Sequence, residues 1–304
     1  MPGNPAGGGA VSGPTAREIA RRHDLHATKS GWRGRCPSCG YAETLVLWAR
    51  PDGSPAAWCA NCHDDDAVAR SLGAEPCQQA QNDGANIEDA KQAAKKKQRR
   101  ALALWNGADL APGTIAATYV AARHVPHLAS CPDLRFRRDT PHPEGGRLPA
   151  MLALVRDVAG APCAIWRTYL RPDGSGKANA EPSRAGLGPV WGCAVRLAPL
   201  AAELVIGEGI ETSAAAGVLA GLPAWAALSA GNMERGLILP VGVRSVVIAV
   251  DADPPGERAA DGAARRWQAE GRTVRLLRPH LRGQDAADVL AAQCRARTVE
   301  AANA

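Results

Sequence analysis

Short apolar runs alternate with helix-forming segments in the last third of the chain. The runs at residues 204–207, 224–228, 245–250 and 273–277 are typical of strands buried in a parallel sheet. Helices are predicted between them at 210–219 and 257–270, and further helices are predicted to begin at 229–232 and 283–288. This alternation predicts a parallel sheet with right-handed crossovers, in which the carboxyl ends of the strands share one edge.

Before residue 200 the apolar pattern changes, and it predicts strands in adjacent pairs. Residues 148–157 and 163–170 predict two strands joined by an Ala-Gly-Ala turn, after helices at 101–105 and 114–123. Nearer the N-terminus, residues 44–48 and 56–58 flank a Pro-Asp-Gly-Ser turn and predict a hairpin. A short helix at 16–23, capped by Thr15, is predicted before the hairpin.

Composition places these elements in a globular protein of two or three domains. The chain has 304 residues, 46% of them apolar, and no apolar run approaches the roughly 20 residues needed to cross a bilayer. The N-terminus has neither the basic start nor the apolar core of a signal peptide, so we expect a cytoplasmic location. Residues 1–15, rich in Gly, Pro and Ala, are expected to be disordered.

Four of the nine cysteines form two Cys-x-x-Cys pairs separated by nineteen residues: Cys36, Cys39, Cys59 and Cys62. Each pair folds two thiolates onto one side of a tight turn, and two pairs complete a tetrahedral zinc site. The spacing predicts a zinc ribbon over residues 16–74 with one structural zinc ion. The alternative is a redox dithiol, for which a single pair would suffice. His63 is expected to be a surface residue, since four thiolates are already present.

Aromatic and basic side chains surround the cysteines, among them Arg35 and Trp58. They would suit stacking on single-stranded bases. The tryptophans could instead form a small core under the hairpin, and the sequence does not separate these two interpretations. Residues 75–100 end in the basic run Lys95-Lys-Lys-Gln-Arg-Arg100. We expect a basic linker or solvated helix there rather than a row of phosphate contacts.

The net charge of +6 is unevenly distributed. Basic residues exceed acidic ones by 14 to 11 in residues 1–100 and by 11 to 7 in residues 101–200, whereas acids exceed bases by 12 to 11 in residues 201–304. Basic N-terminal regions with an acidic, cation-binding end suit a protein that handles nucleic acid together with a metal.

Acidic residues end the predicted parallel strands. Glu208 follows the first strand, Asp251 and Asp253 follow the third, and Asp285 and Asp288 precede the last helix. Taken alone, Asp251 could be a helix cap and Asp253 a solvated turn residue. Carboxylates gathered at one sheet edge repel each other unless a cation lies between them, and such oxygen ligands suit Mg²⁺ or Mn²⁺. We therefore predict a divalent metal site at this edge.

A group of cations precedes the acidic edge in the sequence. Arg167 and Arg171 near Lys177, on and beside a polar, glycine-bearing loop, form a candidate phosphate-binding group, which Arg184 could extend. The loop is not a Walker motif, because the GxxxxGK[ST] spacing is absent.

The acidic residues carry a family resemblance. Glu208-Gly209 after one strand, Asp251-Ala-Asp253 after a later strand and a third acidic site at Asp285 look like the Toprim domain of bacterial primases, topoisomerases and some nucleases. The segment at 283–288 is similar to the GKDxxD ending of mobile-element primases, with Gln284 in place of the usual Lys. With the upstream cysteines, the chain resembles Toprim-domain DNA primases with an N-terminal zinc ribbon, of the plasmid, phage and mobile-element type related to bacterial DnaG-type primases.

This resemblance implies an α/β chain of five parts. They are disordered residues 1–15, the zinc ribbon at 16–74, a basic linker at 75–100, an α+β primase core at 101–200 and a Rossmann-like parallel-sheet Toprim domain at 201–304. The implied activity is that of a DNA primase, which makes short RNA primers on single-stranded DNA by divalent-metal-dependent nucleotidyl transfer. The implied site residues are Glu208, Asp251 and Asp253 as catalytic metal-binding acids, Asp285 and Asp288 as secondary ligands, and Arg167, Lys177, Arg184, Trp58 and Arg35 as nucleotide- or template-binding residues.

Two alternatives stay open: a Toprim-type metal-dependent nuclease, and a non-catalytic zinc-ribbon nucleic-acid-binding protein of a mobile element. The presence of Glu208, Asp251 and Asp253 speaks against the second. The implied partners are single-stranded DNA and ribonucleoside triphosphates. Because the sequence contains no Walker loop, we also expect a separate replicative helicase.

Overall fold

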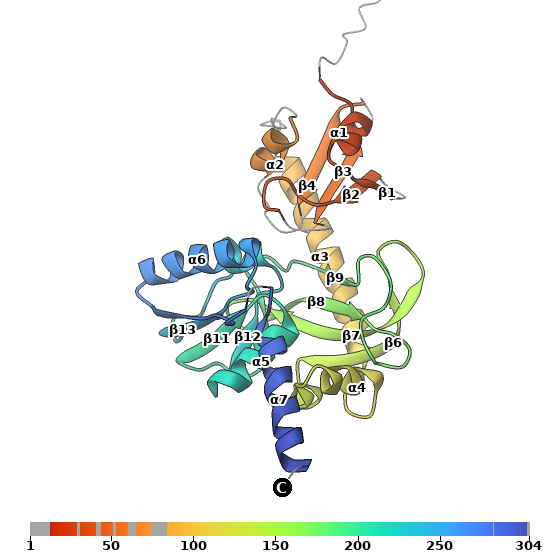
Figure 1. The fold of residues 1–304 in the computed structure, drawn as a ribbon. Coiled ribbons are helices and arrows are strands. Elements are labelled where there is room, and N and C mark those ends of the chain that lie inside the picture. The colour runs from red at the N-terminus through yellow and green to blue at the C-terminus, as the bar shows by residue number, and fades with distance from the viewer. Residues whose placement is uncertain are drawn as a thin grey trace, which may run out of the picture. The chain divides into compact units, whose positions relative to one another are not determined.

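The chain divides into two compact units, Met1–Gln81 and Asn82–Ala304 (Figure 1). The computed structural model describes residues 13–28, 31–40, 44–50, 53–59, 65–73, 84–281 and 283–302. The predictions for Cys62, for His63 and for disorder in residues 1–12 therefore lie outside the described residues. Within the described part, every helix is too short or too polar to cross a membrane.

The first unit is built on a four-stranded antiparallel sheet in the order β1-β2-β3-β4. Its elements are α1 (Ala16–Arg22), β1 (His26–Thr28), β2 (Gly31–Gly34), β3 (Leu45–Ala49), β4 (Pro55–Cys59) and α2 (Asp65–Ser71). The hydroxyl of Thr15 accepts a hydrogen bond from Glu18 N, and the Glu18 carboxylate accepts one from Thr15 N, so the predicted cap is confirmed as a capping box. The predicted hairpin is β3 and β4.

The two faces of this hairpin differ because successive side chains of a strand point to opposite sides. Leu45 and Leu47 are fully buried and form a small core with the buried Cys59 and residues of α1 and α2. Trp48 pairs with Ala56, and Trp58 pairs with Val46. These pairs lie on the opposite face, where Trp48 and Trp58 are 37% and 38% exposed.

The second unit begins with one long helix, α3 (Gly84–Asn106). The helix continues through residues 100 and 101, where the sequence suggested the end of a linker. Its cations from Lys95 to Arg100 are exposed or partly exposed, whereas Ala101 and Trp105 are buried against β8. Gln98 also donates a hydrogen bond to Pro162 O, at 3.1 Å. Packing of the apolar C-terminal turns of α3 thus anchors the basic segment that precedes them.

The middle of the chain forms the antiparallel part of a ten-stranded sheet. Its elements are β5 (Asp109–Leu110), α4 (Ile115–Ala122), the 3₁₀ turn η1 (Pro126–Ser130), β6 (Leu134–Pro141), β7 (Arg147–Arg156), β8 (Pro162–Tyr169), β9 (Arg184–Leu187) and β10 (Ala194–Arg196). The two strands predicted around the Ala-Gly-Ala turn are β7 and β8, which pair along most of their length.

The last third continues the same sheet with parallel strands, as predicted. Its elements are β11 (Glu203–Gly207), α5 (Ile210–Ala220), β12 (Ala224–Ala226), the π-helical turn η2 (Asn232–Gly236), β13 (Ser245–Ala249), α6 (Pro254–Ala269), β14 (Thr273–Leu277) and α7 (Ala286–Ala302). The helix predicted to begin at 229–232 is only the five-residue turn η2. The order along the sheet is β14-β13-β11-β12-β10-β7-β6-β5, and β8 and β9 continue from β7.

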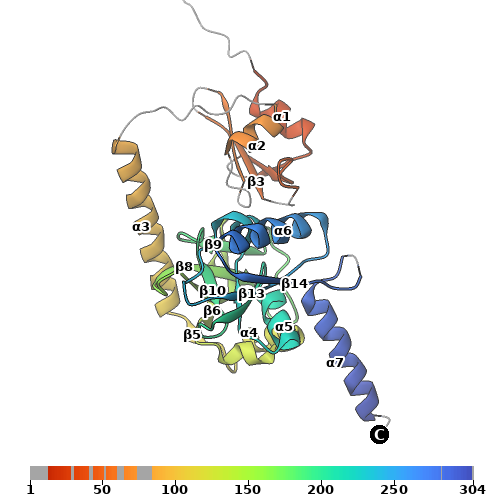
Figure 2. The same cartoon turned by 90° about the vertical axis from the view of Figure 1, so that its left-hand side faces the viewer.

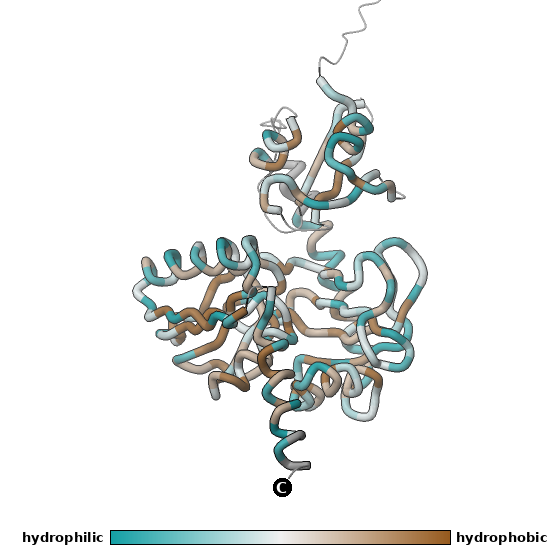
Figure 3. The backbone as a smooth tube through the Cα atoms, viewed as in Figure 1, coloured by the Kyte–Doolittle hydropathy of each residue, from teal (hydrophilic) through white to brown (hydrophobic). Residues whose placement is uncertain are grey.

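Helices cover both faces of the parallel strands. Helix α6 lies on one face, and α5 with α7 on the other (Figures 1 and 2). The strands carry the apolar segments of this region, whereas α6 alternates between polar and apolar residues (Figure 3). Such two-sided coverage explains why β11 and β13 are continuous apolar runs instead of alternating ones.

Strands β11 and β13 are adjacent and parallel, with Ile206 opposite Ile248. The helices that follow them, α5 and α6, lie on opposite faces of the sheet. Parallel α/β sheets bind ligands where successive connections leave in opposite directions. Glu208 and Asp251 follow these two strands, so the fold places both at such a switch point.

Candidate active site and metal centre

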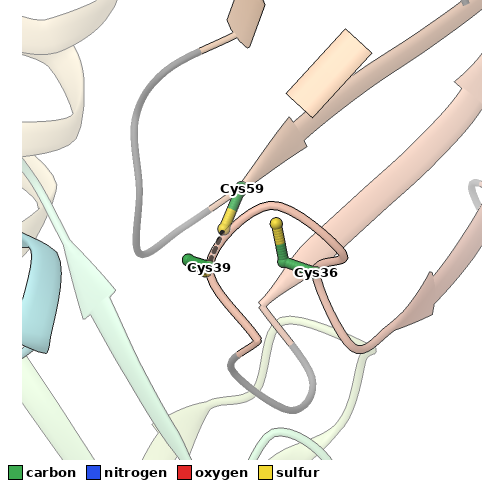
Figure 4. A group of neighbouring side chains, drawn as sticks. All are labelled: Cys36, Cys39 and Cys59. Carbon is green, nitrogen blue, oxygen red and sulfur yellow. Dashed lines mark hydrogen bonds between the residues drawn. The ribbon is translucent and has the colours of Figure 1, made fainter. Parts of the chain in front are cut away.

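Three cysteines converge in the first unit. Cys36 and Cys39 belong to the turn after β2, and Cys59 ends β4 (Figure 4). Their sulfur atoms all lie within 4.8 Å of one another, and among the described residues no other group of three His, Cys, Asp or Glu residues comes this close. Gly40 N donates to Cys36 O at 2.7 Å, which closes the turn of the first pair. The first cysteine pair therefore meets Cys59 of the second pair, as a zinc ribbon requires.

The geometry of the sulfurs fits a metal site. Cys39 Sγ and Cys59 Sγ are 3.7 Å apart, too far for a disulfide bond of about 2.05 Å. Zn–S bonds of about 2.3 Å in a tetrahedron place sulfurs about 3.8 Å apart. The Thr44 hydroxyl lies 3.4 Å from Cys59 Sγ, in a position to orient that ligand. Because both pairs contribute sulfurs, the arrangement favours metal binding over a dithiol.

The predicted nucleic-acid residues of this unit lie apart from its core. Trp58 is on the outer face of the hairpin, together with Trp48. Trp32, by contrast, packs against the core. Of the two interpretations left open by the sequence, the small core therefore applies to Trp32, and stacking on bases remains a prediction for the exposed Trp58. Arg35 Nη1 donates to Gly40 O, so this side chain supports the first cysteine turn.

Asp251 is the central carboxylate of the acidic edge. Its Oδ1 is buried and has no hydrogen-bond partner among the described residues. Burial raises the pKa of Asp251 to about 7, repulsion from Glu208, Asp285 and Asp253 contributes to the rise, and Arg184 opposes it. An unpaired buried oxygen among several acids is the environment that a cation stabilises. The acids predicted to meet are thus brought to one edge.

Asp253 has a structural role as well. Its backbone is extended, and its Oδ1 accepts a hydrogen bond from Gly256 N at 2.7 Å, so it is the N-cap of α6. Pro254 follows at the first helical position. A Cβ on Gly256 would lie 2.9 Å from Asp251 Cβ, so glycine lets the first turn of α6 pass close to Asp251. The alternative interpretation of the sequence, with Asp251 as the cap and Asp253 as a solvated turn residue, is therefore wrong, since Asp253 is the cap.

Asp285 and Asp288 form a reciprocal cap at the start of α7. Asp285 Oδ1 accepts from Asp288 N at 3.0 Å, and Asp288 Oδ2 accepts from Asp285 N at 3.1 Å. Asp285 Oδ2 also accepts from the Thr212 hydroxyl at 2.9 Å. The loop carrying Asp285 is tied to the loop after β13, since Ala252 N donates to Gln284 O and Gly283 N to Ala252 O. These bonds hold Asp285 beside Asp251.

Glu208 stands at the end of β11, partly buried, and Leu228 N donates to its backbone carbonyl at 2.8 Å. No three carboxylates of the described edge bring ligand oxygens within 4.8 Å of one another. The edge is thus an open acidic site rather than a closed cage. Mg²⁺ suits such a site, because it keeps several waters and takes phosphate oxygens as further ligands.

Two of the predicted phosphate-binding cations, Lys177 and Arg184, face this edge. Arg184, at the start of β9, has its Nη1 3.9 Å from the position of a Cβ on Gly209 and acts electrostatically on Asp251. Lys177 Nζ lies 3.9 Å from Oε1 of Glu211, on α5. Both side chains therefore come from the middle of the chain and reach the first turn of α5.

Arg167 does not join them. Its side chain is 6% exposed and donates to the backbone carbonyls of Pro141, Ala185 and Gly186 at 2.8–3.2 Å. These three hydrogen bonds are structural, so the guanidinium holds β8, β9 and the end of β6 together.

The sequence did not reveal a buried group beside the acidic edge. Glu211 lies in the first turn of α5 and is only 5% exposed. The Tyr119 hydroxyl donates to its Oε1. The one available signal was the acid itself within an alanine-rich helix, and its partners from α4 and the 171–177 loop could not be inferred from spacing.

Comparison with known proteins places two domains in the second unit. Residues 203–296 match the Toprim domain family, and residues 95–197 match a domain of unknown function, DUF7146. No curated protein matches the chain. The parallel sheet, its acidic edge and the family match define residues 203–296 as a Toprim domain, which confirms the resemblance seen in the sequence.

Solved structures similar to this chain include several primases. A DNA primase domain from Pseudomonas aeruginosa is 17% identical, with a TM-score of 0.43 over 67% of this chain and 78% of that one. The zinc-binding and RNA polymerase domains of the Aquifex aeolicus primase are 13% identical, with a TM-score of 0.45 over 92% and 80%. The primase fragment of the bacteriophage T7 primase-helicase is 12% identical, with a TM-score of 0.42 over 88% and 97%.

Proposed function

We propose that this protein is a DNA primase that synthesises short RNA primers on single-stranded DNA by divalent-metal-dependent nucleotidyl transfer. The observation that carries the proposal is the meeting of two opposite charge groups at the Toprim edge. Glu208 and Asp251 supply acids, and Lys177 and Arg184 supply cations from the preceding region. A metal-bound nucleoside triphosphate carries both kinds of charge and complements both groups.

Each group has its own part in the reaction. Glu208, Asp251 and Asp253 would hold Mg²⁺ or Mn²⁺, with Asp285 and Asp288 as secondary ligands. When bound, such an ion activates an attacking hydroxyl and neutralises the departing phosphate. Lys177 and Arg184 bind and orient the triphosphate through their positive charge. Phosphoryl transfer depends mainly on such positioning and charge neutralisation, so no covalent side-chain chemistry is needed.

The first unit would bind the template. Cys36, Cys39, Cys59 and Cys62 hold one structural zinc ion in this proposal, and the outer face of the hairpin, with Trp58, stacks on unpaired bases. The proposed domains are residues 16–74, 101–200 and 201–304, with residues 75–100 between the first two and α3 crossing the boundary at residue 100. A separate replicative helicase would open the duplex, and the protein would act in the cytoplasm.

The experiment separates primer synthesis from DNA cleavage, because the same acidic edge would serve a Toprim nuclease. The full chain is incubated with Mg²⁺, labelled ribonucleotides and single-stranded DNA of mixed sequence. New labelled oligoribonucleotides support a primase, shortened DNA supports a nuclease, and neither product with retained DNA binding supports a non-catalytic binder.

A further inference from the structure

Glu211 is an ionisable group buried next to the Toprim edge but outside its predicted metal ligands. It occupies the second position of α5 and is 5% exposed. A buried carboxylate is costly unless it is paired and hydrogen-bonded. Glu211 has both kinds of partner on one oxygen: the Tyr119 hydroxyl donates to Oε1, and Lys177 Nζ lies 3.9 Å from the same atom.

Glu211 and Lys177 each favour the charged form of the other. Burial alone would raise the pKa of Glu211, but Lys177, Tyr119 and Arg184 hold it below its ordinary value. Burial lowers the pKa of Lys177, and Glu211 is the strongest opposing influence. The other charged groups that act on Lys177 are Arg184, Arg123 and Asp285. The two arginines favour a neutral lysine, so Glu211 is the main group that keeps the ammonium charged.

Three elements from different parts of the chain build this arrangement. Tyr119 belongs to α4, Lys177 to the loop after β8, and Glu211 to α5. The loop packs directly on α4, because a Cβ on Gly174 would lie 2.8 Å from Ile115 O. Tyr119 and Lys177 lie in the segment matching the domain of unknown function, and Glu211 lies in the Toprim domain. The contact therefore joins the two.

We propose that Glu211, held by Tyr119, is a positioning residue that directs the Lys177 ammonium at the triphosphate of a nucleotide bound beside Glu208. This inference rests on the proposed function and adds to it. Part of the domain of unknown function thereby gains a specific role. It supplies the nucleotide-binding cation Lys177, and a carboxylate of the Toprim domain, Glu211, positions that cation. Lysine needs such a partner because its ammonium is a point charge on a flexible stem.

Binding of ATP with Mg²⁺ to the full-length protein tests the proposal. Glu211→Gln keeps the side-chain shape but removes the charge, so we expect the Kd for ATP to rise about tenfold, because the Lys177 ammonium loses the charge partner that positions it. The ratio of the Kd of the variant to that of the wild type should grow as the pH rises, because the unpaired Lys177 loses its proton more readily. A purely structural defect would give a ratio independent of pH.

Matched variants complete the test. Tyr119→Phe keeps the ion pair but removes one hydrogen bond, and we expect a rise of about threefold in Kd; it also replaces Glu211→Gln as the test if that variant does not fold. Glu203→Gln removes a carboxylate at the opposite end of β11 and should leave the Kd unchanged. If the wild type binds ATP and both Glu211→Gln and Tyr119→Phe bind it equally well, the positioning role is wrong while the proposed function stands. If the wild type binds no nucleotide, the proposed function fails as well.

Discussion

Lys177 and Glu211 form an ion pair, with 3.9 Å between Nζ and Oε1, and this pair connects the middle of the chain to the Toprim domain. Glu211 is three residues from Glu208, so the contact fixes a cation one helical turn from the acidic edge. The site is therefore not confined to the residues that resemble the Toprim motif.

Removing the cation tests how far this pair contributes to folding. Lys177→Met leaves Glu211 buried without its charge partner, and we expect the free energy of unfolding to fall by about 1–3 kcal/mol. Arg275→Met breaks the exposed pair between Arg275 and Glu203 and should change it by less than about 1 kcal/mol. Urea unfolding of the two variants measures the difference. Equal effects would show that the buried pair is worth no more than a surface one.

Asp251 should make the metal-free protein less stable at high pH. Its pKa in the folded state, about 7, lies above the value of about 3.9 expected in the unfolded chain. Its contribution to stability is therefore complete below about pH 4 and is lost as the pH rises through about 7. Asp251→Asn should raise the melting temperature clearly at about pH 8 and hardly at about pH 4.

Two controls accompany the pH series. Asp261→Asn, in an exposed ion pair on α6, should show no such pH-dependent gain. Mg²⁺ should stabilise the wild type at about pH 8 and stabilise Asp251→Asn less, because the carboxylate that attracts the ion is absent. A gain from Asp251→Asn that is the same at all pH values would contradict the electrostatic explanation.

The cysteine cluster predicts one bound zinc ion per chain. Cys59→Ser removes a fully buried sulfur of the cluster and should abolish zinc binding and unfold the first unit. Cys294→Ser, on α7, should keep the metal. Elemental analysis of the purified proteins gives the zinc content, and circular dichroism with a chelator reports the unfolding. A Cys59→Ser protein that retains a full zinc equivalent would refute the assignment.

We predict that the first unit binds a single-stranded template by stacking Trp58 on its bases. Because stacking on one aromatic ring contributes about 1–3 kcal/mol per base, Trp58→Ala should weaken single-stranded DNA binding by roughly fivefold or more. Trp191, equally exposed at 38% but in the second unit, provides the matched control. Fluorescence anisotropy with a labelled oligonucleotide measures both. Unchanged affinity in Trp58→Ala would assign the outer face of the hairpin another role.

The sequence predicted the parallel sheet and its acidic edge well, because buried parallel strands and helices leave strong periodic patterns. Glu208 and Asp251 could be placed together once β11 and β13 were known to be parallel. The short turn η2 was predicted as a helix, since local composition does not show where a segment stops. The sequence also did not show that the two neighbouring acids have different roles. Asp253 caps α6, whereas Asp251 is buried and its Oδ1 has no hydrogen-bond partner within the part of the chain that the structure describes.

The basic residues were harder to assign than the acids. Arg167 and Lys177 look alike in the sequence, but Arg167 donates to three backbone carbonyls and Lys177 faces Glu211. The difference depends on which strand edge and which helix end lie nearby, and these are long-range contacts. For the same reason the role of Tyr119, 92 residues away from Glu211 in the chain, could not be predicted.

Primer synthesis by the wild type and Asp251→Asn proteins tests the central claim most directly. Both proteins are incubated with Mg²⁺, ribonucleotides and single-stranded DNA, after equal folding has been verified by circular dichroism. We predict labelled RNA oligomers with the wild type and a loss of at least about a hundredfold in their rate of formation with Asp251→Asn, the scale expected when a group that stabilises transition-state charge is removed. Equal primer synthesis by the two proteins would contradict the proposed active site.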